Sequence, residues 1–242
     1  APGLATARSV DRGRLERVAY TRAASRLLAE TDANVESARA AATTASLGDR
    51  TGSVAVRARD VRATAGVSTT DAERAVGGVL VDRGFDVDLD DPDHEFRVLF
   101  AGDTCLLGWL AVESVRDYGS RKPTDRPFFQ PGSMDPLDAR AYANLAGAGP
   151  GRTVLDPMCG TGGLLVEAGL AGSHVVGVDA QSKMVRGSRE NLETYLDDGY
   201  DVVRGDATRL PVAAGAVDGA VVDAPYGRQS KIAGHELDDL LR

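Results

Sequence analysis

Residues 154–163 read Val154-Leu155-Asp156-Pro157-Met158-Cys159-Gly160-Thr161-Gly162-Gly163, an apolar run that ends in an acid and a glycine-rich loop. Glycines let the backbone approach a ligand closely at the start of a helix. The loop lacks the Gly-Lys-Ser or Gly-Lys-Thr ending of a P-loop, and Leu165 stands where a dinucleotide fingerprint needs another glycine. We therefore expect a strand, a ligand-binding loop and a helix. The loop is neither a P-loop nor a dinucleotide-binding loop.

The second half of the chain alternates strand-like and helix-like runs. Apolar runs typical of buried strands occur at 153–156, 174–179, 201–205 and 217–223. Helices are expected at 138–146, 164–169 and 182–196. This alternation predicts a parallel sheet with helical crossovers. Because ligands of such sheets bind beyond the carboxyl ends of the strands, the acids at those ends are candidate site residues: Asp156, Asp179, Asp206 and Asp223.

The first half predicts a compact α/β or α+β module. Residues 15–28 have apolar positions near helical spacing and residues 38–45 favour a helix, so a small helical or mixed element is expected there. The pattern then predicts strands at 53–59, 85–89, 95–101 and 104–112, with a helix at 71–84. Gly102-Asp103 is a hairpin turn between the last two strands. Residues 118–136, rich in Pro, Gly, Arg and Asp, indicate a linker.

The composition is that of a soluble globular protein with an unusual choice of charged residues. The 242 residues are 43% hydrophobic and 26% charged, enough for one large or two ordinary domains. Asp occurs 26 times and Glu 10 times, whereas Arg occurs 25 times and Lys 3 times, and the net charge is -8. Short carboxylates stay hydrated in concentrated salt, so the pattern favours a halophilic protein. A GC-rich genome would explain the scarcity of Lys but not the excess of Asp.

Several classes of protein are disfavoured. Cys105 and Cys159 are the only cysteines, and we expect reduced thiols in a cytoplasmic protein, with a disulfide as the weaker alternative. The sequence has no apolar run of membrane-spanning length and no signal-peptide pattern, so neither is expected. His94, His174 and His235 lie far apart without ligand spacing, so no metal site is expected.

The glycine loop and the acids after it carry a resemblance. The spacing Asp156-x-x-x-Gly160-x-Gly162 resembles motif I of the S-adenosylmethionine-dependent methyltransferases. The resemblance implies that Asp156 lies near the amino end of the cofactor's methionine, that Asp179 binds the ribose and that Asp206 binds the adenine. It also assigns further residues to the cofactor site: Pro157, Thr161, Ala180 and Ala207. Each acid taken singly is more often a helix cap or a solvated loop residue.

The last strand ends in Asp223-Ala224-Pro225-Tyr226, which resembles the Asp/Asn-Pro-Pro-Tyr motif of methyltransferases that modify exocyclic amino groups. An aryl amine is a poor nucleophile because its lone pair is delocalised into the ring. Hydrogen bonds from the amine to the Asp223 carboxylate and a loop carbonyl would localise that lone pair, and Tyr226 would stack on the base. Ala224 replaces the first proline of the motif, which keeps the carbonyl but removes some rigidity.

The whole chain resembles the archaeal tRNA guanine-10 N2-methyltransferases, a family with a THUMP domain, and residues 128–134 and 139–146 carry that specificity. The resemblance implies an α/β fold in which a ferredoxin-like piece and an α+β THUMP module precede a Rossmann-like methyltransferase domain. The expected domains are 1–49 (ferredoxin-like), 50–117 (THUMP, RNA-binding), 118–136 (linker) and 137–242 (methyltransferase, with C-terminal strands missing). The implied reaction is methylation of a guanine N2 amine in tRNA, once or twice, in a haloarchaeal monomer.

Three other functions remain open at this point. The same site suits a ribosomal RNA guanine N2-methyltransferase, a DNA adenine N6-methyltransferase, or a non-catalytic RNA-binding protein that keeps the scaffold. A concentration of basic residues favours RNA over DNA and is a candidate phosphate-contacting face: Arg57, Arg59, Arg62, Arg116, Arg121, Lys122 and Arg126.

Overall fold

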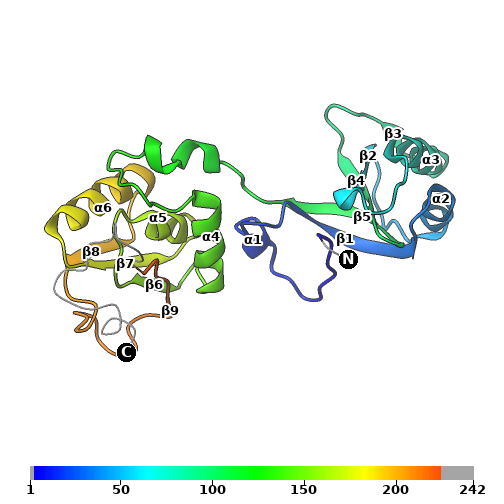
Figure 1. Cartoon of the computed structure of the whole chain (residues 1–242). Coiled ribbons are helices and arrows are strands. Elements are labelled where there is room, and N and C mark those ends of the chain that lie inside the picture. Colours follow the sequence, from blue (N-terminus) through cyan, green and yellow to red (C-terminus); the bar gives the residue numbers. More distant parts are fainter. Residues whose placement is uncertain (1–2, 225–242) are drawn as a thin grey trace. The chain divides into compact units, whose positions relative to one another are not determined.

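Two separate hydrophobic cores organise the chain. The computed structural model describes residues 3–224, which divide into two compact units (Figure 1). Unit 1 comprises Ala1–Glu16 and Arg22–Glu113, and unit 2 comprises Arg17–Thr21 and Ser114–Arg242. Within the described residues, no helix has both the length and the apolar character needed to cross a membrane. Each unit is described by itself below.

Unit 1 is a five-stranded mixed sheet packed against two helices. Its elements are α1 (Arg12–Leu15), β1 (Ala23–Asp32), α2 (Val35–Thr44), β2 (Ser53–Asp60), η1 (Val61–Ala63), α3 (Thr69–Asp82), β3 (Asp86–Val87), β4 (His94–Ala101) and β5 (Thr104–Glu113). The strand order is β1-β5-β4-β2-β3. Strand β5 is antiparallel to β1 and β4, whereas β2 is parallel to β3 and β4. The hairpin predicted at Gly102-Asp103 is confirmed, since Ala101 pairs with Thr104.

Alternating apolar residues build the core of unit 1. Phe96, Val98 and Phe100 on β4 are fully buried and belong to the same cluster as residues of α2 and α3. The ring of Trp109 on β5 lies 4.9 Å from the ring of Phe96, centroid to centroid. Ser68 caps α3 by accepting a hydrogen bond from the Asp71 backbone N–H. Strand period and helix cap thus explain why these segments match the predicted ones.

Of the two structures expected near residues 15–28, helical or mixed, the mixed one is found, and the helical spacing is misleading over the second half. Leu27 and Leu28 lie in β1, which pairs with β5 along most of its length. Register shifts between Ala24 and Ser25, and between Leu27 and Ala29, interrupt the alternation that marks a strand. The apolar residues therefore fall at irregular intervals that imitate helical spacing. Because β1 and α2 share the sheet and core of β2–β5, residues on both sides of position 49 form one unit.

Unit 2 contains the predicted parallel sheet. Its elements are η2 (Tyr118–Arg121), η3 (Pro123–Asp125), α4 (Pro136–Leu145), β6 (Thr153–Asp156), α5 (Gly163–Leu170), β7 (His174–Asp179), α6 (Ser182–Tyr195), β8 (Tyr200–Arg204) and β9 (Gly219–Ala220). The strand order is β8-β7-β6-β9, and all pairs are parallel. The winding runs from β6 through β7 to β8 and then returns to the other side of β6. This reversal is the place where α/β sheets bind ligands.

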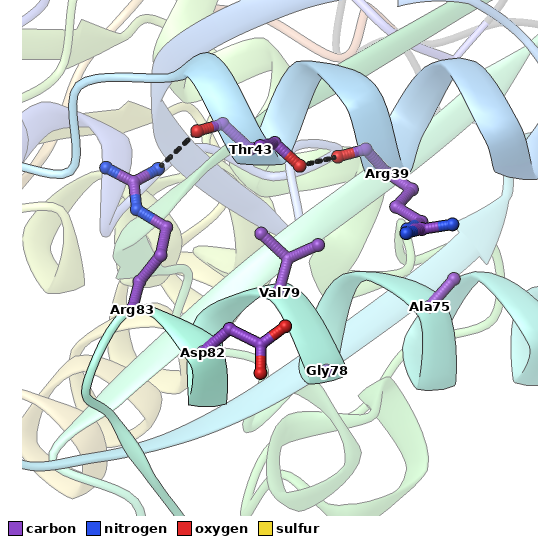
Figure 2. Close-up of a pocket in the computed structure, with 7 residues that line it drawn as sticks. All are labelled: Arg39, Thr43, Ala75, Gly78, Val79, Asp82 and Arg83. Carbon is purple, nitrogen blue, oxygen red and sulfur yellow. Dashed lines mark hydrogen bonds between the residues drawn. The ribbon is translucent and has the colours of Figure 1, made fainter.

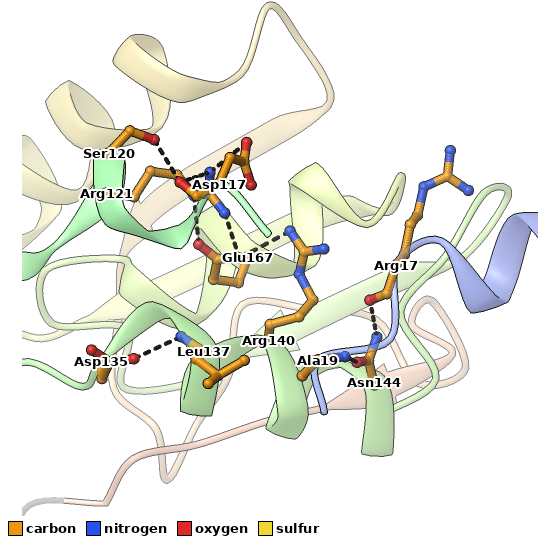
Figure 3. Close-up of polar contacts among 10 residues, drawn as sticks. All are labelled: Arg17, Ala19, Asp117, Ser120, Arg121, Asp135, Leu137, Arg140, Asn144 and Glu167. Carbon is orange, nitrogen blue, oxygen red and sulfur yellow. Dashed lines mark hydrogen bonds and ion pairs between the residues drawn. The ribbon is translucent and has the colours of Figure 1, made fainter. Parts of the chain in front are cut away.

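Residues 118–136 pack as part of unit 2, although their composition indicated a linker. Glu167 on α5 is fully buried, and its carboxylate receives Arg121 Nε at 2.8 Å and Arg140 Nη2 at 2.9 Å (Figure 3). Arg126 Nε donates to the Arg121 carbonyl at 3.1 Å. Arg121 and Arg126 are only 3% and 4% exposed, so neither belongs to a phosphate-contacting face.

The short segment Arg17–Thr21 also packs in unit 2, through Asn144 of α4 (Figure 3). The Asn144 side chain accepts a hydrogen bond from the Ala19 N–H at 3.0 Å and donates one to the Arg17 carbonyl at 3.1 Å. Arg116 Nη1 donates to the Ala19 carbonyl at 3.0 Å. Unit 2 is therefore assembled from two separate stretches of sequence.

The two cysteines are unpaired, as predicted. Cys105 lies on β5 in unit 1 and Cys159 lies in the loop after β6 in unit 2, and both are buried free thiols. Burial raises the pKa of Cys105 to about 12 and raises that of Cys159 still further. Thiols with raised pKa values are poor nucleophiles at neutral pH, so both residues act as small core side chains.

Candidate active site

The predicted site residues lie at the carboxyl edge of the sheet of unit 2. Asp156 ends β6 and Asp179 ends β7. In the parallel register Asp156 pairs with Gly177, and Asp179 pairs with Arg204 at the end of β8. Val221, just after β9, still donates its N–H to the Leu155 carbonyl at 2.9 Å. The sheet therefore brings the ends of β6, β7 and β9 to the same edge.

The loop after β6 folds over the end of β7. Cys159 N donates to the Val178 carbonyl at 2.9 Å, and Gly160 N donates to Asp179 Oδ2 at 3.0 Å. Gly160 and Gly162 have φ values of 51° and 76°, in the left-handed region that favours glycine. A Cβ at Gly160 would meet no atom within 4 Å, so the loop faces open space there. The glycines thus shape a loop whose backbone is exposed to a ligand.

The other side of the loop packs tightly. A Cβ at Gly162 would lie 2.4 Å from Ser188 Oγ on α6, and a Cβ at Gly163 would lie 2.5 Å from Arg126 Nη1. Ser133 and Thr161 hydroxyls are 3.2 Å apart, within hydrogen-bond distance. The loop is therefore held between α6 and the segment that precedes α4, and only glycine fits at positions 162 and 163 without displacing a neighbour.

Asp156 is a buried carboxyl with little compensation. It is 2% exposed, and its Oδ1 accepts one hydrogen bond, from Met158 N at 3.0 Å. Burial raises the pKa of Asp156 to about 7, the Met158 hydrogen bond opposes that shift, and the charges of Asp179 and Asp223 add to it. The carboxyl groups of Asp179 and Asp223 are therefore close enough to act on that of Asp156. Such a group of acids favours a cationic ligand.

Asp179 holds the loop as well as the start of α6. Its Oδ2 accepts from Gly160 N at 3.0 Å and its Oδ1 accepts from Gln181 N at 2.8 Å. Burial raises the pKa of Asp179, and these two backbone hydrogen bonds lower it in part. A carboxylate oxygen accepts more than one hydrogen bond, so both oxygens retain capacity for a ligand hydroxyl.

Asp206 and Ala207 lie in the turn after β8 and are half-buried. Asp206 Oδ1 accepts from Thr208 N at 2.9 Å and from Thr208 Oγ1 at 2.8 Å. Gly205 N donates to the Asp179 carbonyl at 3.1 Å, which joins this turn to the end of β7. The shape of the turn is thus set by Asp206 itself, as for an acid in a self-capped loop.

The last predicted motif is described only in part. Asp223 and Ala224 are half-buried after β9, and burial raises the pKa of Asp223. Its charge raises the pKa of Asp156, so the Asp223 carboxyl lies near that of Asp156. Pro225 and Tyr226 lie outside the described residues.

One residue in contact with the predicted site escaped the sequence analysis. Asn191 of α6 is fully buried and makes three hydrogen bonds to backbone atoms of Phe128 and Thr161. Its position inside a predicted helix carried no signal, because a helix interior usually places an Asn on the solvent side. Contacts that join residues this far apart in sequence are visible only in the fold.

A separate hollow lies in unit 1, between α2 and α3, and encloses about 460 Å³ (Figure 2). Arg39, Asp82 and Arg83 are its charged lining residues. Arg83 Nη1 donates to the carbonyls of Ala42 and Ala45, each at 2.8 Å, and so caps the end of α2. None of the predicted site residues up to Ala224 lines this hollow. Over residues 3–224 there is also no cluster of three or more His, Cys, Asp or Glu side chains arranged to hold a metal ion.

Comparison with known families gives a match over residues 123–240. The family is described as "RMKL-like, methyltransferase domain". The matched residues include the segment before α4, the glycine loop and the four acids at the strand ends.

Related proteins and a solved structure extend the similarity toward the N-terminus. A protein from Methanothermobacter thermautotrophicus named tRNA (guanine(10)-N2)-dimethyltransferase is 42% identical over 178 residues, which are 73% of this chain and 53% of that protein. One of the same name from Pyrococcus abyssi is 35% identical over 185 residues, 75% of this chain and 55% of that protein. TrmN from Thermus thermophilus matches with a TM-score of 0.50 at 26% identity, over 92% of this chain and 68% of that chain. The chain spans about half the length of the curated relatives it matches.

Proposed function

We infer the function from one premise: the chain is a homologue of proteins named tRNA (guanine(10)-N2)-dimethyltransferase and has a mixed α/β methyltransferase fold similar to that of TrmN. We propose that it transfers methyl groups from S-adenosylmethionine to the exocyclic N2 amine of guanine 10 in tRNA, once or twice. The relatives do not favour the ribosomal RNA, DNA or non-catalytic alternatives.

The observation that carries the proposal is the group of acids around the glycine loop. Asp156, Asp179 and Asp223 have raised pKa values because they are buried, and the charges of Asp179 and Asp223 act on Asp156. S-adenosylmethionine carries an ammonium and a sulfonium group, so it would compensate these carboxylates. The open space at Gly160 leaves room for the cofactor beside the backbone of the loop. The residues present therefore fit the cofactor in charge and in shape.

Each part of the loop edge has a role in this proposal. Asp156 would bind the ammonium end, and the loop from Pro157 to Gly162 would contact the methionine part. Asp179 and Ala180 would bind the ribose, and Asp206 with Ala207 would bind the adenine. When bound, the cofactor supplies an electrophilic methyl group. The sign of the charges and the order of these residues along the edge support the assignments.

Asp223 has a different task, which is to prepare the guanine amine. Its carboxylate would accept a hydrogen bond from the N2 amine, and the Ala224 carbonyl would accept the other. These two acceptors draw the nitrogen toward sp³ geometry and free its lone pair. The half-buried position of Asp223 strengthens such hydrogen bonds, because the local dielectric is lower than that of water. Pro225 and Tyr226 complete the motif in the proposal, with Tyr226 stacking on the base.

We further propose that unit 1 contains the ferredoxin-like piece and the THUMP module, and that the THUMP module binds the tRNA. Arg59 and Arg62 support this, because both remain exposed in unit 1 whereas Arg121 and Arg126 are buried in unit 2. The excess of Asp over Lys supports a halophilic enzyme that acts in concentrated salt. A tRNA substrate, as in the relatives' names, supports a cytoplasmic location. Replacing Arg59 and Arg62 together by Ala is expected to weaken tRNA binding without changing cofactor binding.

Methyl transfer in vitro tests the proposal. The chain is incubated in molar salt with methyl-labelled S-adenosylmethionine and an unmodified archaeal tRNA transcript, and the labelled nucleosides are identified by mass spectrometry. The expected products are N2-methylguanosine and N2,N2-dimethylguanosine at position 10. Label in ribosomal RNA or DNA, but not in tRNA, would overturn the substrate. Cofactor binding with no label in any acceptor would favour the non-catalytic alternative.

Two variants at positions on either side of β9 sharpen this experiment. Asp223→Ala is expected to lower the transfer rate by a factor on the order of 100 or more while cofactor affinity stays near that of the wild type. Asp218→Ala is the matched control, because Asp218 precedes β9 and its carboxylate accepts from Thr153 N at 2.8 Å, away from the carboxyl edge. Transfer by Asp223→Ala at the control's rate would contradict the role given to Asp223.

A further inference from the structure

Asn191 joins two segments that approach the proposed cofactor site from different parts of the chain. Its Oδ1 accepts from the Phe128 N–H at 2.9 Å, and its Nδ2 donates to the Phe128 carbonyl at 2.8 Å. Nδ2 also donates to the Thr161 carbonyl at 2.9 Å. The amide thus uses an acceptor and both donors on backbone atoms only.

The bond to Thr161 falls on the part of the glycine loop where the backbone must turn. Gly162, the next residue, has a φ of 76° and precedes the first residue of α5. Fixing the Thr161 carbonyl orients the peptide between Thr161 and Gly162. That peptide carries the N–H that donates to the Cys159 carbonyl at 2.7 Å. Asn191 therefore acts on the conformation of the loop and not only on its position.

The neighbours of Asn191 on α6 show that this face of the helix is fitted to the same two segments. A Cβ at Gly187 would lie 2.0 Å from the ring of Phe128, and Ser188 Oγ lies against Gly162. Lys183 Nζ lies 5.6 Å from the centroid of the Phe128 ring. Positions 183, 187 and 191 are four residues apart, so they line one stripe of the helix. This stripe of α6 packs against the ring of Phe128 and bonds its backbone, close to the glycine loop.

Because Asn191 is buried, losing any of these hydrogen bonds is costly. The residue is 0% exposed, so water does not replace a lost partner. Thr161 is half-buried, and a backbone carbonyl that loses its donor there is unfavourable, so the loop would move to find another donor. The Thr161 carbonyl receives its hydrogen bond from the side chain of Asn191, which is 30 residues away in sequence.

We propose that Asn191 is a positioning residue for the cofactor: it sets the conformation of the glycine loop through the Thr161 carbonyl and holds Phe128 against α6 in the same step. The inference rests on the proposed function, because it assigns the loop to S-adenosylmethionine. Asn191 itself touches backbone atoms of the loop and not the reacting groups.

Two substitutions test this role. Asn191→Asp keeps the size of the side chain and the acceptor for Phe128 N but removes both N–H donors. Asn191→Ala removes all three bonds. Asn144→Ala is the matched control, because Asn144 is also a helical Asn that bonds two backbone groups, those of Arg17 and Ala19, away from the loop. The control loses comparable hydrogen bonds without affecting Thr161.

The first readout is cofactor affinity, measured by calorimetry with S-adenosylmethionine and the full chain at a temperature where all variants are folded. Asn191→Asp and Asn191→Ala are expected to raise the Kd about tenfold or more. In the transfer assay the KM for the cofactor rises and kcat at saturation changes little. Asn144→Ala lowers the melting temperature but leaves the Kd and the KM unchanged.

The second readout is hydrogen exchange of the amides in residues 159–163 without any cofactor. Faster exchange there in both Asn191 variants, but not in Asn144→Ala, supports the inference even if the wild type fails to bind S-adenosylmethionine, an outcome that would overturn the proposed function alone. Exchange and cofactor affinity equal to those of the control would overturn the inference and leave the proposed function intact. An Asn191→Asp variant with wild-type affinity would overturn it as well.

Discussion

Two acids in unit 2 are almost completely buried, and their surroundings differ. Glu167 has both carboxylate oxygens paired with guanidinium groups, those of Arg121 and Arg140. Asp156 accepts one backbone N–H, and the charges of Asp179 and Asp223 act on it. Within the residues that the structure describes, two guanidinium groups compensate the charge of Glu167, whereas no cationic side chain pairs with Asp156. Burial is common to both, so it is the lack of a cationic partner within residues 3–224 that supports the binding role proposed for Asp156.

The largest expected effect concerns Glu167. Glu167→Ala leaves the guanidinium groups of Arg121 and Arg140 buried without their carboxylate, and we expect the free energy of unfolding to fall by about 3–5 kcal/mol. Urea denaturation measures it. Asp117→Ala is the control, since it removes a 58% exposed partner of Arg121 and is expected to cost less than about 1 kcal/mol. Equal falls in the free energy of unfolding of the two variants would show that the burial of Glu167 and its arginines is unimportant for stability.

Asp156→Asn is expected to raise the free energy of unfolding at pH 8, whereas Glu167→Ala lowers it. The folded-state pKa of Asp156 is raised to about 7, so the stability that comes from its neutral form is full at low pH and is lost as the pH rises through 7. The Asn side chain does not ionise, so the variant keeps this stability at high pH. Denaturation at pH 8 should therefore show the variant to be about 2–4 kcal/mol more stable than the wild type, with a smaller difference at pH 5. A variant less stable at pH 8 would contradict the comparison with Glu167.

The same carboxyl predicts a pH dependence of cofactor binding. A cationic ligand favours the ionised form of Asp156, whose pKa before binding is about 7, so affinity should decrease as the pH falls. Binding of S-adenosylmethionine is expected to be about tenfold weaker at pH 6 than at pH 8. Calorimetry at several pH values measures this, and Asp156→Asn should bind more weakly with a flatter profile. A wild-type affinity that is constant from pH 6 to pH 8 would argue against the ammonium contact.

The smallest expected effect concerns the loop beside Asp156. Gly160→Ala places a methyl group in open space at a φ of 51°, and we expect a loss of about 1 kcal/mol in the free energy of unfolding from backbone strain. Gly162→Ala adds a contact of 2.4 Å with Ser188 Oγ and should cost more. Denaturation compares the two directly, and the reverse order would mean that the loop does not pack on α6 as described.

The sequence predicted the sheet of unit 2 and the acids at its edge because both depend on local patterns. Continuous apolar runs mark buried parallel strands, and each run stops at or near an acid. Strand β1 escaped prediction because its register shifts break the alternation of apolar residues. Local period is thus a reliable guide only where the pairing is regular.

The supporting residues of the site were not predictable in the same way. Arg121 and Glu167 are 46 residues apart, and Phe128 and Asn191 are 63 apart. No spacing rule connects such pairs, because the fold alone brings them together. The composition of residues 118–136 indicated a linker, because Pro, Gly, Arg and Asp are common in connecting segments. Its burial follows from the carboxylate of Glu167, which lies inside an apolar stretch of α5.

The attachment of Arg17–Thr21 to Asn144 has a practical consequence for dividing the protein. A fragment that begins after β5 would contain all of the parallel sheet but would lack the backbone groups that Asn144 and Arg116 bind. One end of α4 would then present unmet hydrogen-bonding groups to solvent. Unit 2 is an interrupted stretch of sequence, so an autonomous version needs residues 17–21 supplied again, for example by fusing them ahead of residue 114 through a short glycine-rich connection.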